Sequence, residues 1–251
     1  MADLKIHNET IKDVGLVIFD KDGTLMNLYK YWSGMLTFRV DIAQRKLGFE
    51  DVHRKGIMYA MGADTDKERL RSDGQVGLKK REIVMQAMTD ALENIGLKDT
   101  HDVCIEIFRE ADEMSIDHLP ELIEPIAGMN SLVSGLSRRK CMIAVATTDK
   151  SERARLALKH LGINDMIDVV VGADMVEHSK PAPDMVNMVL EKTGIRKENA
   201  VVVGDAVTDM EMGVNAGVRA SIGVCSGLTS RDDLLRKTKY VIEDVSEIRT
   251  L

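Results

Sequence analysis

Two aspartates with one residue between them, Asp20 and Asp22, directly follow an apolar run in the N-terminal part of the chain. The run Leu16–Phe19 contains no polar residue, which is typical of a strand buried on both faces of a parallel sheet. Residues 20–24 would then form the loop at the carboxyl end of this strand, where open α/β sheets bind their ligands. Carboxylates crowded at such a place repel each other unless a cation or a reaction uses them. The pair therefore predicts a cation-binding or reactive site.

Further reactive side chains stand where later segments of the same kind end. They are Thr147 and Thr148 after residues 141–146, Asp205 and Asp209 after residues 200–203, and Lys180 in a loop before Pro-Ala-Pro. If the apolar runs are parallel strands, their carboxyl ends lie on one edge of the sheet, so residues far apart in the sequence meet there. The sequence thus predicts one composite site.

The chemistry of this set is that of phosphoryl transfer. Asp20, Asp205 and Asp209 offer the oxygen ligands that suit Mg²⁺. Lys180 and a threonine hydroxyl could neutralise and orient phosphoryl oxygens while a carboxylate attacks in line and forms an aspartyl-phosphate. The second carboxylate of the pair, Asp22, could protonate the leaving alkoxide and then take a proton from water.

The elements that must position these residues follow from the pattern of apolar side chains. From residue 129 onward, short apolar runs alternate with amphipathic segments, which predicts βαβ crossovers and a mostly parallel sheet. Residues 29–121 predict helices only, apart from a polar loop between Gly62 and Gly77, and several amphipathic helices in succession indicate a small bundle. We therefore expect an α/β core interrupted after its first strand by a helical insert.

Composition narrows the class of protein. The 251 residues carry a formal charge of −7, which argues against nonspecific nucleic-acid binding because that needs a basic surface. Three widely spaced cysteines favour a reducing compartment, and no apolar run approaches the ~18 residues of a membrane span. The N-terminal residues 1–12 are polar and lack the apolar core of a signal peptide. We expect a cytoplasmic protein with no nucleic-acid or membrane partner.

The reactive segments resemble, in order and context, the four motifs of the haloacid dehalogenase superfamily. The matching segments are Asp-Lys-Asp-Gly-Thr-Leu at 20–25, Thr147 after its apolar run, Lys-Pro-Ala-Pro-Asp at 180–184, and Gly-Asp-Ala-Val-Thr-Asp at 204–209. The third has the form found in phosphoglycolate-phosphatase-like members. The resemblance covers the whole chain, since the helical insert stands where that subfamily carries its cap domain.

The resemblance implies a fold and an activity. The fold would be a Rossmann-like parallel-sheet core of residues 1–27 and 125–251, with an α-helical bundle cap of residues 28–124. Because the insert is a separable helical unit joined by two short crossings, we also expect it to open and close over the site. The activity would be Mg²⁺-dependent hydrolysis of a small phosphorylated metabolite through an aspartyl-phosphate.

The resemblance also implies a role for each motif residue. Asp20 would be the nucleophile, and Asp22 the general acid and base. Mg²⁺ would be bound by the side chains of Asp20 and Asp205 and by the backbone carbonyl of Asp22. Asp209 would assist through water. Thr147 and Lys180 would bind the phosphoryl oxygens.

Other interpretations of single residues stay open. Thr148 could replace Thr147 as the phosphate ligand, and either Thr148 or Asp149 could cap the helix that begins near Ser151. Asp209 could merely favour a helix N-terminus electrostatically. Basic residues in or beside the polar loop could be solvated, or one of them could bind a second anionic group of the substrate; they are Arg69, Arg71, Lys79 and Lys80.

Two other functions also stay open. A phosphomutase of the β-phosphoglucomutase type would share the core motifs, with a sugar hydroxyl in place of water meeting the aspartyl-phosphate. A phosphorylation-dependent signalling switch without turnover would use an Asp, a Thr and a Lys around Mg²⁺ in a similar way.

Overall fold

The structure is a computed structural model that describes residues 1–77 and 79–251. The chain divides into two compact units: one of residues 1–27 and 125–251, here called the α/β unit, and one of residues 28–124, here called the helical unit. Each unit has buried apolar residues of its own. No helix among the described residues is both long enough and apolar enough to cross a membrane.

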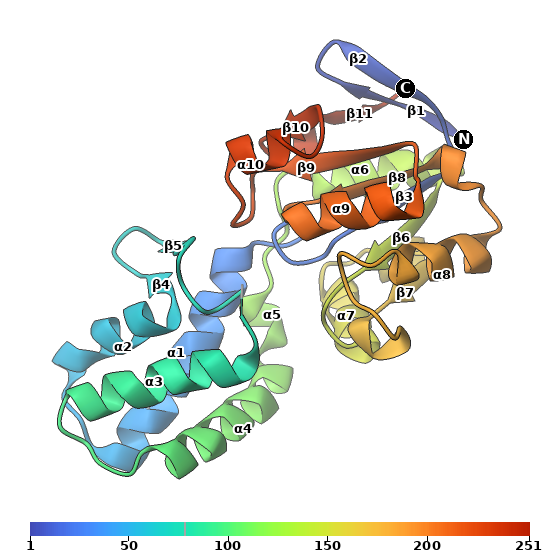
Figure 1. Ribbon diagram of the computed structural model, residues 1–251. Helices are drawn as coiled ribbons and strands as arrows, with labels where there is room; N and C mark the ends of the chain where they lie inside the picture. Colours follow the sequence, from blue (N-terminus) through green and yellow to red (C-terminus); the bar gives the residue numbers. More distant parts are fainter. Residues whose placement is uncertain (78) are drawn as a thin grey trace. The chain divides into compact units, whose positions relative to one another are not determined.

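Six strands form the main sheet of the α/β unit, in the order β10-β9-β8-β3-β6-β7 (Figure 1). The central strand β3 (Leu16–Phe19) lies between β8 and β6, and all four of its residues are buried. The neighbouring strands pair in parallel, which confirms the predicted α/β class and parallel sheet. The other strands are β6 (Met142–Ala146), β7 (Val169–Val171), β8 (Ala200–Gly204), β9 (Ala220–Val224) and β10 (Tyr240–Ile242).

Helices cover the sheet because successive strand residues point to opposite faces and both faces are apolar. Leu16 and Ile18 of β3 belong to one apolar cluster with residues of α8 and α9. Helix α6 packs against β6 and lies behind the sheet in Figure 1. The helices of this unit are α6 (Met129–Arg138), α7 (Ser151–His160), α8 (Asp184–Thr193), α9 (Val207–Ala216) and α10 (Arg231–Leu235), with single 3₁₀ turns η2 (Asn164–Met166), η3 (Ala173–Met175), η4 (Lys197–Asn199) and η5 (Val245–Glu247).

A second, antiparallel sheet joins the two ends of the described chain in the order β11-β1-β2. Its strands are β1 (Ala2–Ile6), β2 (Glu9–Val14) and β11 (Ile248–Thr250). The sequence analysis did not predict it, because charged residues interrupt the alternation of apolar side chains in these short strands. β11 packs against α6, where a Cβ added to Gly135 would lie 2.6 Å from the Thr250 hydroxyl.

The helical unit contains α1 (Leu28–Leu47), α2 (Arg54–Met61), α3 (Arg81–Asn94), α4 (His101–Asp117), α5 (Leu119–Leu122) and the 3₁₀ turn η1 (Asp51–His53). The prediction of helices only was wrong at one place. Within the expected polar loop, β4 (Ala63–Asp64) pairs antiparallel with β5 (Arg69–Leu70). Strands of two residues are shorter than any period that a sequence pattern can reveal.

Candidate active site

The strand ends place the first reactive residues side by side. Phe19, the last residue of β3, pairs with Val145 on one side and Val203 on the other. The backbone N–H of Asp20 then donates to the Val203 carbonyl at 2.8 Å, which continues the sheet into the loop. Because the three strands are parallel, the residues that follow them gather at one edge of the sheet.

Three carboxylates form a cluster at this edge. One carboxylate oxygen from each of Asp20, Asp205 and Asp209 lies within 4.8 Å of the others, close enough for the three to hold a metal ion. Asp205 is 6% exposed and Asp209 is 1% exposed. The loop after β3, the loop after β8 and the first turn of α9 thus supply one residue each.

Lys180 joins the cluster from the loop between β7 and α8. Its Nζ donates to Asp20 Oδ1 at 2.6 Å and lies 2.6 Å from Asp209 Oδ1, and its side chain is 3% exposed. The contact with Asp209 is an ion pair whose direction falls outside hydrogen-bond geometry. The other oxygen of Asp209 accepts the N–H of Ala206 at 3.0 Å, at the start of α9. Asp209 therefore both supports a helix N-terminus and belongs to the cluster.

The cluster carries more negative charge than one ammonium can balance. Burial raises the pKa of Asp20 to about 6 against the opposing charge of Lys180, and the charges of Asp209 and Asp22 add to the rise. Burial, together with the charges of Asp20 and Asp209, raises the pKa of Asp205 well above its usual range. Burial alone would lower the pKa of Lys180, but Asp20 and Asp209 hold it above its usual value. A divalent cation would relieve this repulsion.

Main-chain atoms of two loops lie directly against the Asp205 carboxylate. A Cβ added to Gly23, whose φ is +91°, would lie 2.8 Å from the carboxyl carbon, and one added to Gly227 would overlap an oxygen. Thr24 Oγ1 donates to Asp205 Oδ1 at 3.4 Å. Ser226 Oγ donates to the Gly23 carbonyl at 2.6 Å and so ties the loop after β9 to the loop after β3. A carboxylate cradled in this way beside two others fits a small cation that oxygen ligands hold.

The two candidate threonines differ in burial. Thr147 directly follows β6, is 0% exposed, and its Oγ1 accepts the N–H of Asp149 at 3.1 Å. Thr148 is exposed. The N–H of Thr147 donates to the Val171 carbonyl at 3.0 Å, which fixes the residue at the end of the sheet. Thr147 is thus held at the end of β6, the strand beside β3, whereas the side chain of Thr148 is exposed.

The side chain of Asp22 does not join the acidic cluster. Its Oδ1 lies 2.5 Å from Nζ of Lys21, whose side chain is buried and also lies 3.6 Å from Asp149 Oδ2. The sequence analysis gave no role to Lys21, Ser226 or Gly227. The position of Lys21 between two aspartates after an apolar run could have indicated that it takes part in the site. The approach of residues 226 and 227 to the first loop could not have been predicted from the spacing of residues in the sequence.

The parallel sheet, the cluster of three carboxylates and the inserted helical unit define a class of α/β protein, and the comparisons with known proteins identify the family. Residues 17–223 match the family described as haloacid dehalogenase-like hydrolase. The chain belongs to this family. The prediction of an enzyme of the haloacid dehalogenase superfamily, with its fold, is thereby confirmed.

Curated relatives are named as phosphatases and pyrophosphatases. The probable phosphatase IndB of Dickeya dadantii is 30% identical over 233 residues, which are 91% of this chain and 89% of that protein. The phosphorylated carbohydrates phosphatase of Thermotoga maritima is 27% identical over 237 residues, or 92% and 95% of the two chains. The match to the pyrophosphatase PpaX of Halalkalibacterium halodurans, 34% identical over 105 residues, covers 42% of this chain and about half, 49%, of that protein.

Solved structures share the fold at low sequence identity. A predicted phosphoglycolate phosphatase from Haemophilus somnus has a TM-score of 0.70 at 18% identity, over 94% of this chain and 97% of that one. A superfamily hydrolase of subfamily IA, variant 1, from Geobacter sulfurreducens has a TM-score of 0.65 at 17% identity, over 94% of each chain. At such identities the likeness concerns the fold alone.

Proposed function

We propose that the protein is a Mg²⁺-dependent phosphatase that hydrolyses a small phosphorylated metabolite through an aspartyl-phosphate on Asp20. The observation that carries the proposal is the contact of Lys180 with Asp20, at 2.6 Å, inside a group of three carboxylates. An ammonium and a cluster of oxygen ligands around one carboxylate suit a phosphoryl group, whose transfer depends on positioning and charge neutralisation. The names of the relatives as phosphatases support the same reaction.

Each residue has a distinct part in this reaction. Asp20 attacks phosphorus in line, while Lys180 and the hydroxyl of Thr147 bind the phosphoryl oxygens. The Thr147 oxygen accepts the Asp149 N–H, so its own hydrogen can serve a phosphoryl oxygen. Asp22 gives a proton to the leaving oxygen and later takes one from the water that hydrolyses the aspartyl-phosphate.

Magnesium would be held by the side chains of Asp20 and Asp205 and by the backbone carbonyl of Asp22, with Asp209 assisting through water. When bound, the ion would neutralise the negative charge of the phosphoryl group and of the crowded carboxylates. The cradle that Gly23 and Gly227 form around Asp205 supports this assignment.

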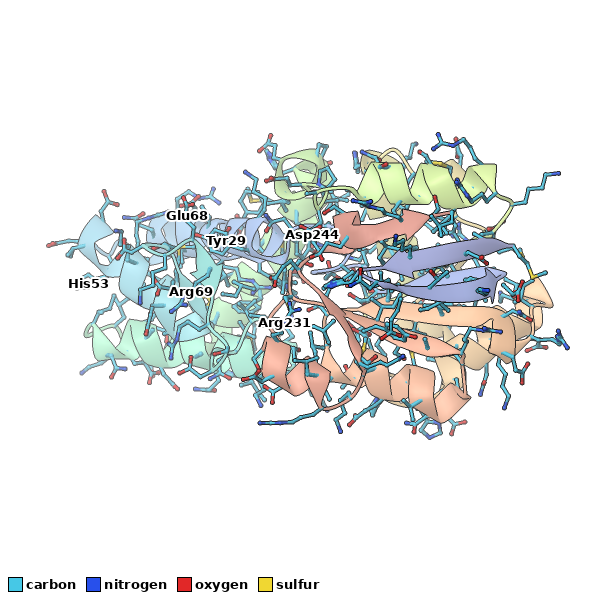
Figure 2. All side chains as sticks on the ribbon, turned by 90° about the horizontal axis from the view of Figure 1, so that it is seen from above. Tyr29, His53, Glu68, Arg69, Arg231 and Asp244 are labelled. Carbon is cyan, nitrogen blue, oxygen red and sulfur yellow. The ribbon has the colours of Figure 1, made fainter. Side chains whose placement is uncertain are left out.

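We further propose that the helical unit is a cap that takes part in substrate selection. Arg71 is already engaged, because it pairs with Asp73 and stacks on the ring of Tyr59 at 4.0 Å. Arg69 is exposed on β5 and is labelled in the helical unit in Figure 2. Arg69 is therefore a better candidate than Arg71 for binding a second anionic group of a substrate, and the Arg69→Met variant should change the relative rates with different phosphorylated metabolites.

A screen tests the proposed function. Sugar phosphates, phosphoglycolate, inorganic pyrophosphate and p-nitrophenyl phosphate are each incubated with the protein and Mg²⁺, and released phosphate is measured. We expect turnover that a chelator abolishes and Mg²⁺ restores, and none in the Asp20→Asn variant, which keeps the size of the side chain but removes the nucleophile. Turnover that survives in Asp20→Asn would exclude the mechanism.

Two other outcomes would point to the alternative functions. Isomerisation of a sugar phosphate in the presence of a bisphosphorylated sugar, without phosphate release, would indicate a mutase. A phosphorylated protein that persists for hours at neutral pH would indicate a switch.

A further inference from the structure

Lys21 stands between the two aspartates of the first loop, yet the residue is only 1% exposed. Its ammonium lies 2.5 Å from Asp22 Oδ1, 3.6 Å from Asp149 Oδ2 and 3.8 Å from the sulfur of Met26. The Lys21 carbonyl accepts hydrogen bonds from the N–H groups of Leu25 and Met26 at 3.0 and 3.2 Å, which closes the turn. Both the backbone and the side chain of this lysine are therefore held in place.

The charges around this lysine explain its burial. A buried ammonium is costly unless it is paired with carboxylates and hydrogen-bonded, and Lys21 has both Asp22 and Asp149 beside it. Without the ammonium, these two partly exposed carboxylates would repel each other. The ammonium of Lys21 thus offsets this repulsion and contacts the Asp22 carboxylate directly.

The same lysine connects two loops of the α/β unit. Asp149 belongs to the loop after β6, and its backbone N–H donates to Thr147 Oγ1 at 3.1 Å. The ion pair between Lys21 and Asp149 therefore links the loop that carries Asp22 to the loop that carries Thr147.

We propose that Lys21 is a positioning residue that holds the carboxylate of Asp22 for its two proton transfers. The inference rests on the proposed phosphatase function. In the first step, an oxygen of Asp20 bonds to phosphorus, the bond from phosphorus to the leaving oxygen breaks, and Asp22 donates its proton to that oxygen. In the second step, water bonds to phosphorus, the bond to Asp20 breaks, and Asp22 accepts the proton of the water. On this inference the attack by Asp20 does not require the Lys21 ammonium, so the proton transfers are the steps that should slow when it is removed.

The test uses p-nitrophenyl phosphate, whose phenolate leaves without needing a proton. The Lys21→Met variant keeps a side chain of similar length but removes the charge. We expect a burst of one phenolate per protein at a rate within about twofold of the parent, then turnover slowed about 100-fold, the loss typical of a misplaced catalytic group. KM should fall together with kcat, because the phosphorylated protein accumulates. An alkyl phosphate, whose leaving oxygen needs the proton, should give slow turnover without a burst.

Two results would overturn the proposal. The first is a burst rate and a steady-state turnover rate that are slowed by the same factor at unchanged KM, which is what a merely structural lysine would give. The second is an unchanged turnover rate. Lys150→Met, which removes an exposed lysine from the loop after β6, is the matched control and should behave as the parent.

Two further measurements keep the outcome decisive. If circular dichroism shows that Lys21→Met does not fold, the double variant Lys21→Met/Asp149→Asn removes one positive and one negative charge together and is measured in the same way. The Asp20→Asn variant distinguishes a failure of the proposed function from a failure of this inference. Turnover that persists in Asp20→Asn ends the aspartyl-phosphate mechanism and the inference with it, whatever Lys21→Met does.

Discussion

The Asp205 carboxylate is enclosed by main chain on two sides, and this enclosure can be tested at Gly227. A methyl group at position 227 would overlap an Asp205 oxygen, so the carboxylate or the loop must move. We expect Gly227→Ala to raise the Mg²⁺ concentration needed for half-maximal activity about 10-fold or more, since a displaced ligand is a weakened ligand. A Mg²⁺ titration of activity measures the effect.

A matched control lies at Gly56 in α2, where an added Cβ meets nothing within 4 Å. Gly56→Ala should leave the Mg²⁺ titration unchanged and stabilise the helix by about 0.5–1 kcal/mol, because alanine loses less backbone entropy than glycine on folding. An unchanged titration in Gly227→Ala would show that Asp205 is not a ligand.

At the scale of elements, the N-terminus of α7 is held by a residue from a different segment. Asp174, in η3, accepts hydrogen bonds from the N–H of Ser151 at 2.7 Å and from its hydroxyl at 2.9 Å. These bonds lower the pKa of Asp174 below its usual value. The carboxylate also lies where the helix dipole favours a negative charge.

The Asp174→Asn variant should therefore melt at a lower temperature than the parent at neutral pH. Because the folded pKa of Asp174 is lowered, its contribution is complete above the unfolded pKa of ~3.9 and is lost as the pH falls through the lower folded value. The difference in Tm should accordingly shrink as the pH is lowered from 6 toward 3. Asp165→Asn, an exposed carboxylate in η2, should give little difference at any pH; a constant difference for Asp174→Asn would contradict the assignment.

Elements with strong local patterns are the ones that a sequence predicts. Continuous apolar runs mark β3 and β8, and glycines mark the ends of α8 and α9 at Gly194 and Gly217, where φ is positive. β4, β5 and β11 have two or three residues each, too few for a period to show. Their formation depends on partners elsewhere in the chain, which a local pattern does not contain.

The site follows the same division. Four site residues could be predicted to meet, because each stands at or beyond a strand end and the carboxyl ends of parallel strands lie at one edge of the sheet. They are Asp20, Lys180, Asp205 and Asp209. The inward position of Lys21 depends on a carboxylate in another loop. These contacts are properties of the folded backbone and have no sequence spacing of their own.

At the scale of the molecule, the two units each have a core, and a single tryptophan reports on one of them. Trp32 lies in α1 of the helical unit. In that unit the Phe108 ring is fully buried, with the Arg39 guanidinium 4.0 Å from its centre. Phe108→Leu removes the aromatic face and leaves space, which should cost about 1–3 kcal/mol.

We expect this cost to appear in one unit only. In urea, the transition followed by Trp32 fluorescence should move to lower concentration in Phe108→Leu, while the last part of the transition followed by circular dichroism stays in place. Val202→Ala, in the buried strand β8 of the α/β unit, should do the opposite. If either variant moves both signals equally, the two units unfold as one cooperative body.

The pairing of β3 has a consequence for how the chain is made. Leu16 pairs with Met142 and with Ala200, so the central strand emerges from the ribosome long before either neighbour exists. At roughly 5–20 residues per second, that interval lasts many seconds. During this interval the helical unit can fold, but the apolar segment Leu16–Phe19 has no neighbouring strands to pair with and stays exposed to solvent. Nascent chains stalled before residue 142 should therefore recruit chaperones at this segment.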